Sequence, residues 1–227
     1  MNHRPTPADV WLERAQQRLL AGDASRAHTL LVRALVEHPD SGALQFALAG
    51  LQRLAGDAVA ADAQLEDLLS REPDHLAAAL QLARSLHGQG RLLAAGALLR
   101  RAFAHAPAEV ERRIDAIELL DDGGRQQDAM ALCEQAFAAG LDDPRLHVHA
   151  AALAAQLGRF EVAREHYELV LTRSRHAADW HVPLGLSSLQ RYRSTDHPDF
   201  ARFQHWLERD DLAPYPRSSL LFALGKA

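Results

Sequence analysis

The chain has 227 residues and a formal net charge of −5, and 48% of its residues are hydrophobic while only 6% are aromatic. A mildly acidic chain lacks the basic surface that nonspecific nucleic-acid binding requires, so we expect no nucleic-acid partner. No apolar run approaches the ~18 residues of a membrane-spanning helix, and the single cysteine, Cys133, excludes an internal disulfide framework. We therefore expect a cytoplasmic protein without a membrane segment.

A glycine followed five residues later by an alanine recurs along the chain. The pairs are Gly22 and Ala27, Gly56 and Ala61, Gly90 and Ala95, Gly124 and Ala129, and Gly158 and Ala163. Each step, such as that from Gly22 to Gly56, is 34 residues, without an insertion or deletion. A constant period of this length indicates a helix-turn-helix repeat, in which the glycine ends the first helix in a left-handed conformation.

Two further sites in each repeat carry small side chains, as close helix packing requires. When Gly22 is set at position 15 of a repeat, position 20 is alanine in all five repeats. The facing position 8 carries Ala15, Ala49, Ala83, Ile117 and Ala151. Position 32, where proline ends the second helix, carries Pro39, Pro73 and Pro107 in the first three repeats.

These features resemble the tetratricopeptide-repeat family over residues 8–177. The resemblance implies an all-α fold, a right-handed α-solenoid of helix-turn-helix repeats with C-terminal capping helices. We predict a disordered leader at residues 1–7 and a partial sixth repeat with C-terminal helices at residues 178–227. The five full repeats are expected at residues 8–41, 42–75, 76–109, 110–143 and 144–177.

Each full repeat is predicted to contain two helices. The expected helices span about residues 8–20, 24–37, 42–54, 59–70, 76–88, 92–105, 108–120, 125–138, 144–157 and 160–173. Thr6 and Pro7 are suited to begin the first helix, as N-cap and first helical residue. Cys133 falls at a core position, where we expect a buried small hydrophobe and not a nucleophile.

The strict repeat ends after five units, and the tail is expected to continue as helices. Residues 178–190 are predicted to form the first helix of a sixth repeat, with Gly185 at its small position. Asp196 as N-cap and Pro198 as first helical residue predict the start of another helix. A last helix is expected to begin near Arg217.

Aromatic residues gather on one of these C-terminal helices. Phe200, Phe203 and Trp206 share one helical face by their spacing. Without a neighbour that covers this face the three side chains would be exposed. A homodimer through the C-terminal helices is therefore one alternative.

The tail also carries a second resemblance. Asp179-Trp180, Gln-Arg-Tyr-Arg at residues 190–193 and Leu-Phe-Ala-Leu-Gly-Lys-Ala at residues 221–227 are similar to the repeat region of bacterial tetratricopeptide-repeat sulfotransferases. The resemblance implies a catalytic domain beyond this chain that transfers a sulfuryl group from the cofactor PAPS. The chain itself is expected to hold no cofactor, no metal and no catalytic residue.

Two local features that suggest chemistry have simpler explanations. Residues 215–220 resemble the phosphate-binding loop of those sulfotransferases, but they lack its preceding strand and its glycine, so we expect a helix start. His147 and His149 are two residues apart, so they point in different directions on a helix and cannot bind one metal ion together.

We place the candidate partner-binding site on the concave groove that the first helices of the repeats line in this family. An acidic stripe is its most distinctive part, because its carboxylates follow one another at helical spacing. The stripe consists of Glu111, Asp115, Glu118 and Asp122. It either binds a basic partner segment or is solvated and paired within the chain, with Arg84 as a candidate counter-charge. The remaining groove positions are Arg53, Arg84, His87 and His149.

One known use of the repeat family is disfavoured. Domains that clamp the acidic tails of chaperones carry Lys and Asn where this chain has Leu12 and Gln16. We therefore predict a protein-interaction scaffold that binds another partner or a protein substrate in its concave groove. Two alternatives remain open: an enzyme whose catalytic domain lies beyond this chain, and a self-associating adaptor.

Overall fold

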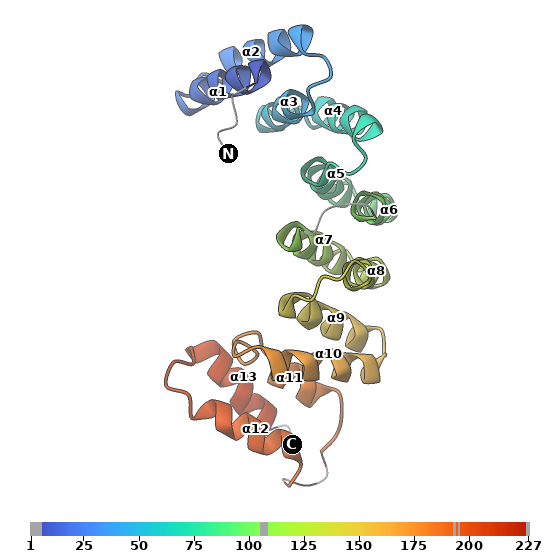
Figure 1. Cartoon of the computed structure of the whole chain (residues 1–227), viewed down its shortest axis with the longest axis vertical. Helices are drawn as coiled ribbons and strands as arrows, with labels where there is room; N and C mark the ends of the chain where they lie inside the picture. The colour runs from blue at the N-terminus through green and yellow to red at the C-terminus, as the bar shows by residue number, and fades with distance from the viewer. Residues whose placement is uncertain (1–5, 105–108, 193, 195, 226–227) are drawn as a thin grey trace. The chain divides into compact units, whose positions relative to one another are not determined.

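A computed structural model of the chain describes residues 6–104, 109–192, 194 and 196–225. Every regular element in these ranges is a helix, as the predicted all-α fold class requires (Figure 1). The chain divides into an N-terminal unit, residues 1–107, and a C-terminal unit, residues 108–227. Some predictions fall outside the described residues: most of the leader, the helix end at His105, Pro107, the helix start at Ala108, Arg193, and residues 226–227.

The N-terminal unit consists of three helical hairpins. Its helices are α1 (Pro7–Leu20), α2 (Ala24–Glu37), α3 (Gly42–Leu54), α4 (Ala58–Arg71), α5 (Leu76–Gly88) and α6 (Leu92–Phe103). In each hairpin the first helix packs against the second, and α2 and α4 also contact the first helix of the next hairpin (Figure 1). The bounds agree with the predicted helices to within one or two residues.

The helix ends follow from local chemistry. Thr6 caps α1 by accepting a hydrogen bond from the backbone N–H of Asp9, whose side chain in turn accepts from the backbone N–H of Thr6. Asp23 and Asp57, each directly after a turn glycine, cap α2 and α4 by accepting a hydrogen bond from the backbone N–H of the residue three positions later. All five predicted turn glycines have a positive φ, from +68° at Gly124 to +86° at Gly56, which glycine adopts without steric strain.

The small residues of the repeat lie in the core. The alanines at position 20 are each at most 2% exposed, and the residues at position 8 are at most 4% exposed. These values confirm the small-residue register that the sequence predicts. Ile117, the largest residue at position 8, is also buried, so the fourth hairpin accommodates it without exposing it.

The C-terminal unit contains two further hairpins and a helical tail. Its helices are α7 (Val110–Asp122), α8 (Gln126–Ala138), α9 (Pro144–Gln156), α10 (Phe160–Arg173), α11 (Val182–Ser188), α12 (Pro198–Leu207) and α13 (Pro214–Gly225). Among the tail helices, α11 packs against α9 and α10, and α13 packs against α11 and α12. All three tail helices contribute to an apolar cluster that includes Tyr167, Val170, Leu186 and Phe203.

The tail differs from the sequence prediction in three bounds. The predicted helix at residues 178–190 is shortened to α11, because His181 has a positive φ of 57° and Pro183 restricts the chain to a new helix start. The N-cap of α12 is His197 and not Asp196, since the His197 ring accepts the backbone N–H of Asp199 at 3.2 Å. The helix α13 begins at Pro214, before the predicted Arg217, because proline is tolerated in a first turn.

The aromatic face of α12 has a covering neighbour, so the exposure on which the homodimer alternative depended is not present. Phe200 is 6% exposed, Phe203 is fully buried, and Trp206 packs half-buried against the same cluster. The physical reason is that α13 folds back over α12 (Figure 1), and its residues Leu220 and Ala223 belong to the same buried cluster as Phe203. The aromatic residues that suggested a homodimer therefore belong to the protein's own core.

Candidate functional site

The predicted groove residues fall in both units, and three of them lie in the N-terminal one. Arg53, on α3, donates to the Asp62 carboxylate on α4 at 2.6 Å. The same carboxylate also accepts from Ser85 on α5 at 2.7 Å. Arg84 is exposed and His87 is half-buried on α5. Arg53 is therefore held inside the unit by an ion pair.

The acidic stripe lies on α7 in the C-terminal unit, and all four of its carboxylates are exposed. Two of them contact cationic or polar groups of α9. Arg145 donates to Glu111 at 3.0 Å, and the His149 ring lies 3.7 Å from Glu118. The hydrogen bond from Arg145 lowers the pKa of Glu111. These contacts favour the interpretation in which part of the stripe is paired within the chain; the eight-residue groove itself stays a prediction.

In the described part of the chain, the side chains that could bind a metal ion do not lie close together in one site. Within the described ranges no group of three or more His, Cys, Asp or Glu side chains is placed to hold a metal ion. Cys133 is fully buried, and burial raises the pKa of its thiol to about 12, so the reactive thiolate is not formed near neutral pH. Residues 215–220 lie in the first turns of α13, as predicted. No helix in the described part of the chain has the length and apolar character to cross a membrane.

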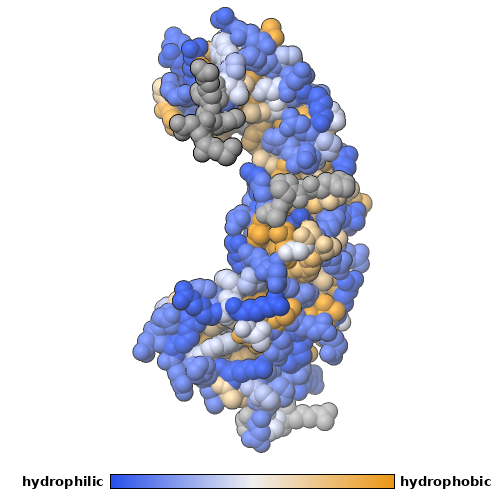
Figure 2. Space-filling view, in the orientation of Figure 1, coloured by the Kyte–Doolittle hydropathy of each residue, from blue (hydrophilic) through white to orange (hydrophobic). Residues whose placement is uncertain are grey.

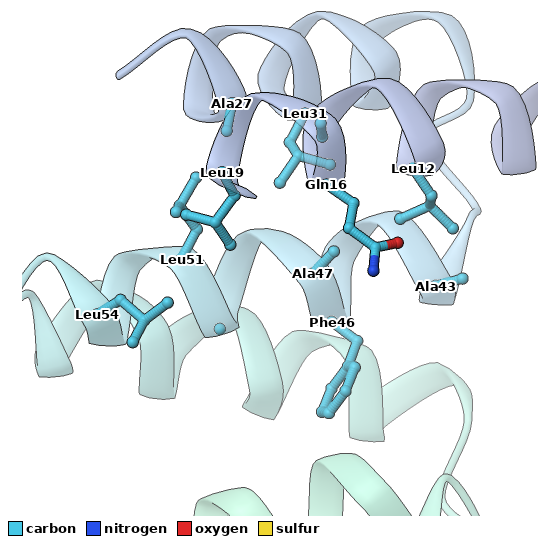
Figure 3. A pocket seen from close by; sticks show the side chains of 12 residues that line it. Leu12, Gln16, Leu19, Ala27, Leu31, Ala43, Phe46, Ala47, Leu51 and Leu54 are labelled. Atoms are coloured by element: carbon cyan, nitrogen blue, oxygen red, sulfur yellow. The ribbon is translucent and has the colours of Figure 1, made fainter. Parts of the chain in front are cut away.

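The structure shows instead an apolar groove in the N-terminal unit, between α1 and α3 with α2 behind them (Figure 3). We call it the α1–α3 groove, and its volume is about 470 Å³. Its lining residues are Leu12, Ala15, Gln16, Leu19, Ala27, Leu31, Ala43, Phe46, Ala47, Gly50, Leu51 and Leu54. Among the described lining residues Gln16 has the one polar side chain.

Helical spacing explains how the sequence builds this groove. Leu12, Gln16 and Leu19 follow at intervals of four and three residues, so they share one face of α1, and Figure 3 shows them pointing toward α3. The facing surface of α3 carries the small residues Ala43, Ala47 and Gly50. Because these side chains are short, the space between the two helices stays open.

Large apolar side chains remain accessible at this groove. Leu54 lines it and is 74% exposed, and Leu19 lines it and is 39% exposed. Leu20, next to Leu19, is 81% exposed. Hydrophilic residues cover most of the face seen in Figure 2, with apolar residues in patches between them. An accessible apolar surface inside a concave site is typical of a binding site for another molecule.

Sequence reasoning missed the groove as a site. It used Leu12 and Gln16 only to exclude a carboxylate clamp, and it did not consider Phe46, Gly50 or Leu54. A usable signal was present, because the two neighbouring repeats both place large apolar residues at positions 5 and 13, where a solvated face would be polar. Only the packing shows that no other part of the described chain fills the space.

A histidine pair connects the two helices of the fifth hairpin in the C-terminal unit. The Nδ1 atoms of His147 and His166 lie 2.8 Å apart, and the His147 Nε2 lies 2.9 Å from Asp142. Phe137 stacks on both rings, at centroid distances of 4.5 and 5.2 Å. Burial, and then the neighbouring His147, lowers the pKa of His166. A hydrogen bond between two Nδ1 atoms needs one proton, and a second proton would break it.

We expect the protein to lose stability as the pH falls below the ordinary histidine pKa of about 6.5. His166 and His149 both have pKa values lowered mainly by burial, so the unfolded chain takes up protons that the folded chain resists. Their contribution to stability is complete above about pH 6.5 and is lost below it. The hydrogen bond from His147 is the main cause of the lowered pKa of Asp142, and this lowering affects stability only below the ordinary aspartate pKa of 3.8.

The measurement is the urea midpoint of unfolding at about pH 7.5 and about pH 5.5. The midpoint of the wild type should be lower at the acidic pH, and His166→Gln should reduce this difference because glutamine does not titrate. His205→Gln is the matched control, since the His205 side chain is 79% exposed. A midpoint that is equal at both values, or higher at the acidic one, contradicts the expectation.

The chain is similar to known proteins at the level of its fold. Neither a protein-family model nor a curated protein matches the chain. Among solved structures, the chain is similar to PilF from Pseudomonas aeruginosa at 18% identity and a TM-score of 0.54, covering 95% of this chain and 96% of that chain. It is also similar to PilW, a widely conserved type IV pilus biogenesis factor, at 15% identity and a TM-score of 0.57, covering 94% and 98%.

A third similar structure is that of the MamA protein, at 15% identity and a TM-score of 0.54, covering 76% of this chain and 94% of that chain. None of these three structures supports the sulfotransferase resemblance, which stays a hypothesis from sequence. At such low identities the similarity shows the fold alone. That fold is an all-α solenoid of helical repeats.

Proposed function

We propose that this protein is a protein-interaction scaffold and that its α1–α3 groove binds an apolar segment of a partner protein. The observation that carries the proposal is the open groove of about 470 Å³, lined almost entirely by apolar side chains. Its size falls within the ~300–1,000 Å³ of ligand-binding clefts, so it can accept several apolar side chains. Burying the accessible parts of Leu19 and Leu54 against a partner would remove apolar surface from water, which is favourable.

The enzyme alternative has less support. The residues that resemble a phosphate-binding loop start α13, and Cys133 is buried with a raised pKa. A PAPS-dependent sulfotransferase activity would need residues outside this chain, and we keep it only as a hypothesis for a longer protein. The acidic stripe on α7 remains a second proposed contact surface, for a basic segment, with Asp115 and Asp122 exposed.

The test is a selection of peptides from a random display library against the purified chain. We expect enriched peptides that are rich in apolar residues, and their affinity should fall at least about tenfold for Leu54→Lys. Leu54 is 74% exposed at the end of α3, so lysine there leaves the fold intact and adds a charge at the groove.

Val59→Lys is the matched control, since Val59 is 83% exposed and does not line the groove. This variant should bind the selected peptides as the wild type does. The proposal fails if no peptide is enriched, or if the enriched peptides bind both lysine variants equally well.

A further inference from the structure

The lining chemistry of the α1–α3 groove indicates what kind of segment fits it. A partner chain that enters the groove loses water from its backbone N–H and C=O groups, which must then find other hydrogen-bond partners. The backbone groups of α1 and α3 are used within those helices, and Gln16 has the one polar side chain among the described lining residues. An extended peptide would leave most of its buried backbone groups unpaired, whereas an α-helix pairs its own.

Gly50 adds a second, independent observation. It lies inside α3, where glycine is less favourable than alanine by about 0.5–1 kcal/mol. A Cβ built at Gly50 would meet no atom within 4 Å, so packing within the described chain does not require glycine there. The residue lines the groove, and its missing side chain leaves room for close approach of another backbone.

Acidic and basic side chains lie on different sides of α1. Asp9 and Glu13 are exposed and lie one turn apart, and helical spacing places both along the edge of α1 that is next to Gln16. Arg14 and Arg18 instead line a separate surface depression with Arg26 of α2. The rim that α1 presents to an occupant of the groove is therefore acidic, and it complements basic side chains.

From these three observations we infer that the occupant of the α1–α3 groove is an amphipathic α-helix of a partner protein. Its apolar residues, spaced at three and four positions, fill the space above Gly50, and lysine or arginine on one flank faces Asp9 and Glu13. This inference rests on the proposed function and specifies the partner's conformation and charge.

The test uses a designed peptide of about 15 residues with leucine on one face and lysine on the flanks. Its binding to the whole chain is measured by fluorescence anisotropy, and its helix content by circular dichroism. We expect binding with a gain in helix content. The same peptide with one central proline should bind at least about tenfold more weakly, because proline breaks the helix. Exchanging the flanking lysines for glutamates should also weaken binding, and added salt should reduce that difference.

Gly50→Leu is the decisive variant. Leucine fits the helical backbone and has open space, so the variant folds, but its side chain fills the groove and should weaken peptide binding at least about tenfold. Gly88→Leu is the matched control, because Gly88 also lies in a helix with no atom near a built Cβ and does not line the groove. It should bind as the wild type does.

The outcomes separate this inference from the proposed function. If library peptides bind at Leu54 while the helical peptide binds no better than its proline form, the helix inference is wrong and the scaffold stands. Equal binding by the Gly50→Leu and Gly88→Leu variants also overturns the inference. If the free protein self-associates with concentration and Gly50→Leu abolishes this, the occupant is a second copy of the chain, which likewise contradicts it.

Discussion

Phe203→Ala is expected to destabilise the C-terminal unit by about 3–5 kcal/mol, the range for removing a buried aromatic ring. Phe203 is fully buried and belongs to the cluster that joins α10, α11, α12 and α13. Its removal leaves a cavity among Tyr167, Leu186 and Leu220, and close-packed neighbours collapse into such a cavity only in part.

The effect is measured by chemical denaturation followed by helix content. Phe160→Ala is the control, because Phe160 is 52% exposed at the start of α10 and should lose less than about 1 kcal/mol. Equal stabilities of the two variants would show that Phe203 does not pack in this cluster, and the aromatic face of α12 would then be exposed as the self-association alternative requires.

Gly185→Ala is expected to destabilise the same unit by about 1–3 kcal/mol, although alanine favours a helix over glycine. A Cβ at Gly185 would lie 2.9 Å from the Tyr167 Cε2 and closer still to the end of the phenol ring. Tyr167 is 6% exposed within the core cluster, so its rigid ring cannot move away without displacing its neighbours.

Gly50→Ala provides the opposite control by the same assay. Its Cβ meets no atom within 4 Å, so the lost glycine flexibility should raise stability by about 0.4–1 kcal/mol. A second check is Gly185→Ala in a Tyr167→Leu background, where the smaller side chain should reduce the loss. If Gly185→Ala is as stable as the wild type in the native background, the close contact between α10 and α11 is absent.

Comparing the two glycines shows where prediction from sequence succeeded and where it did not. The repeat register places Gly185 at a small-residue position, and the structure puts it against Tyr167 as that position requires. Gly50 carries no such signal, because its importance depends on α1 lying across from it at a distance that leaves a space. Glycine is required at position 185 because a Cβ there would meet Tyr167. Gly50 is notable for the opposite reason, since a Cβ there would meet no atom within 4 Å.

The acidic stripe also combines a feature that the sequence predicts with one that depends on packing. The carboxylates of the acidic stripe are exposed on one face of α7, as helical spacing predicts. Their pairing was not predictable, because Arg145 and His149 come from α9 and lie 34 residues from Glu111 and 31 residues from Glu118 in sequence, respectively. The histidine pair was missed for a similar reason: His147 was compared with its sequence neighbour His149, while the structure brings it to His166.

The helical hairpins, their turns and their small-residue contacts could be predicted from the order of the amino acids alone. These features depend on residues close together in the chain, such as Gly56 and Ala61, whose local preferences are set by backbone conformation and side-chain size. The apolar residues that stay exposed to water could be identified only from how the helices pack. Phe203 is buried and Leu54 is exposed, because α13 covers the first and no described helix covers the second.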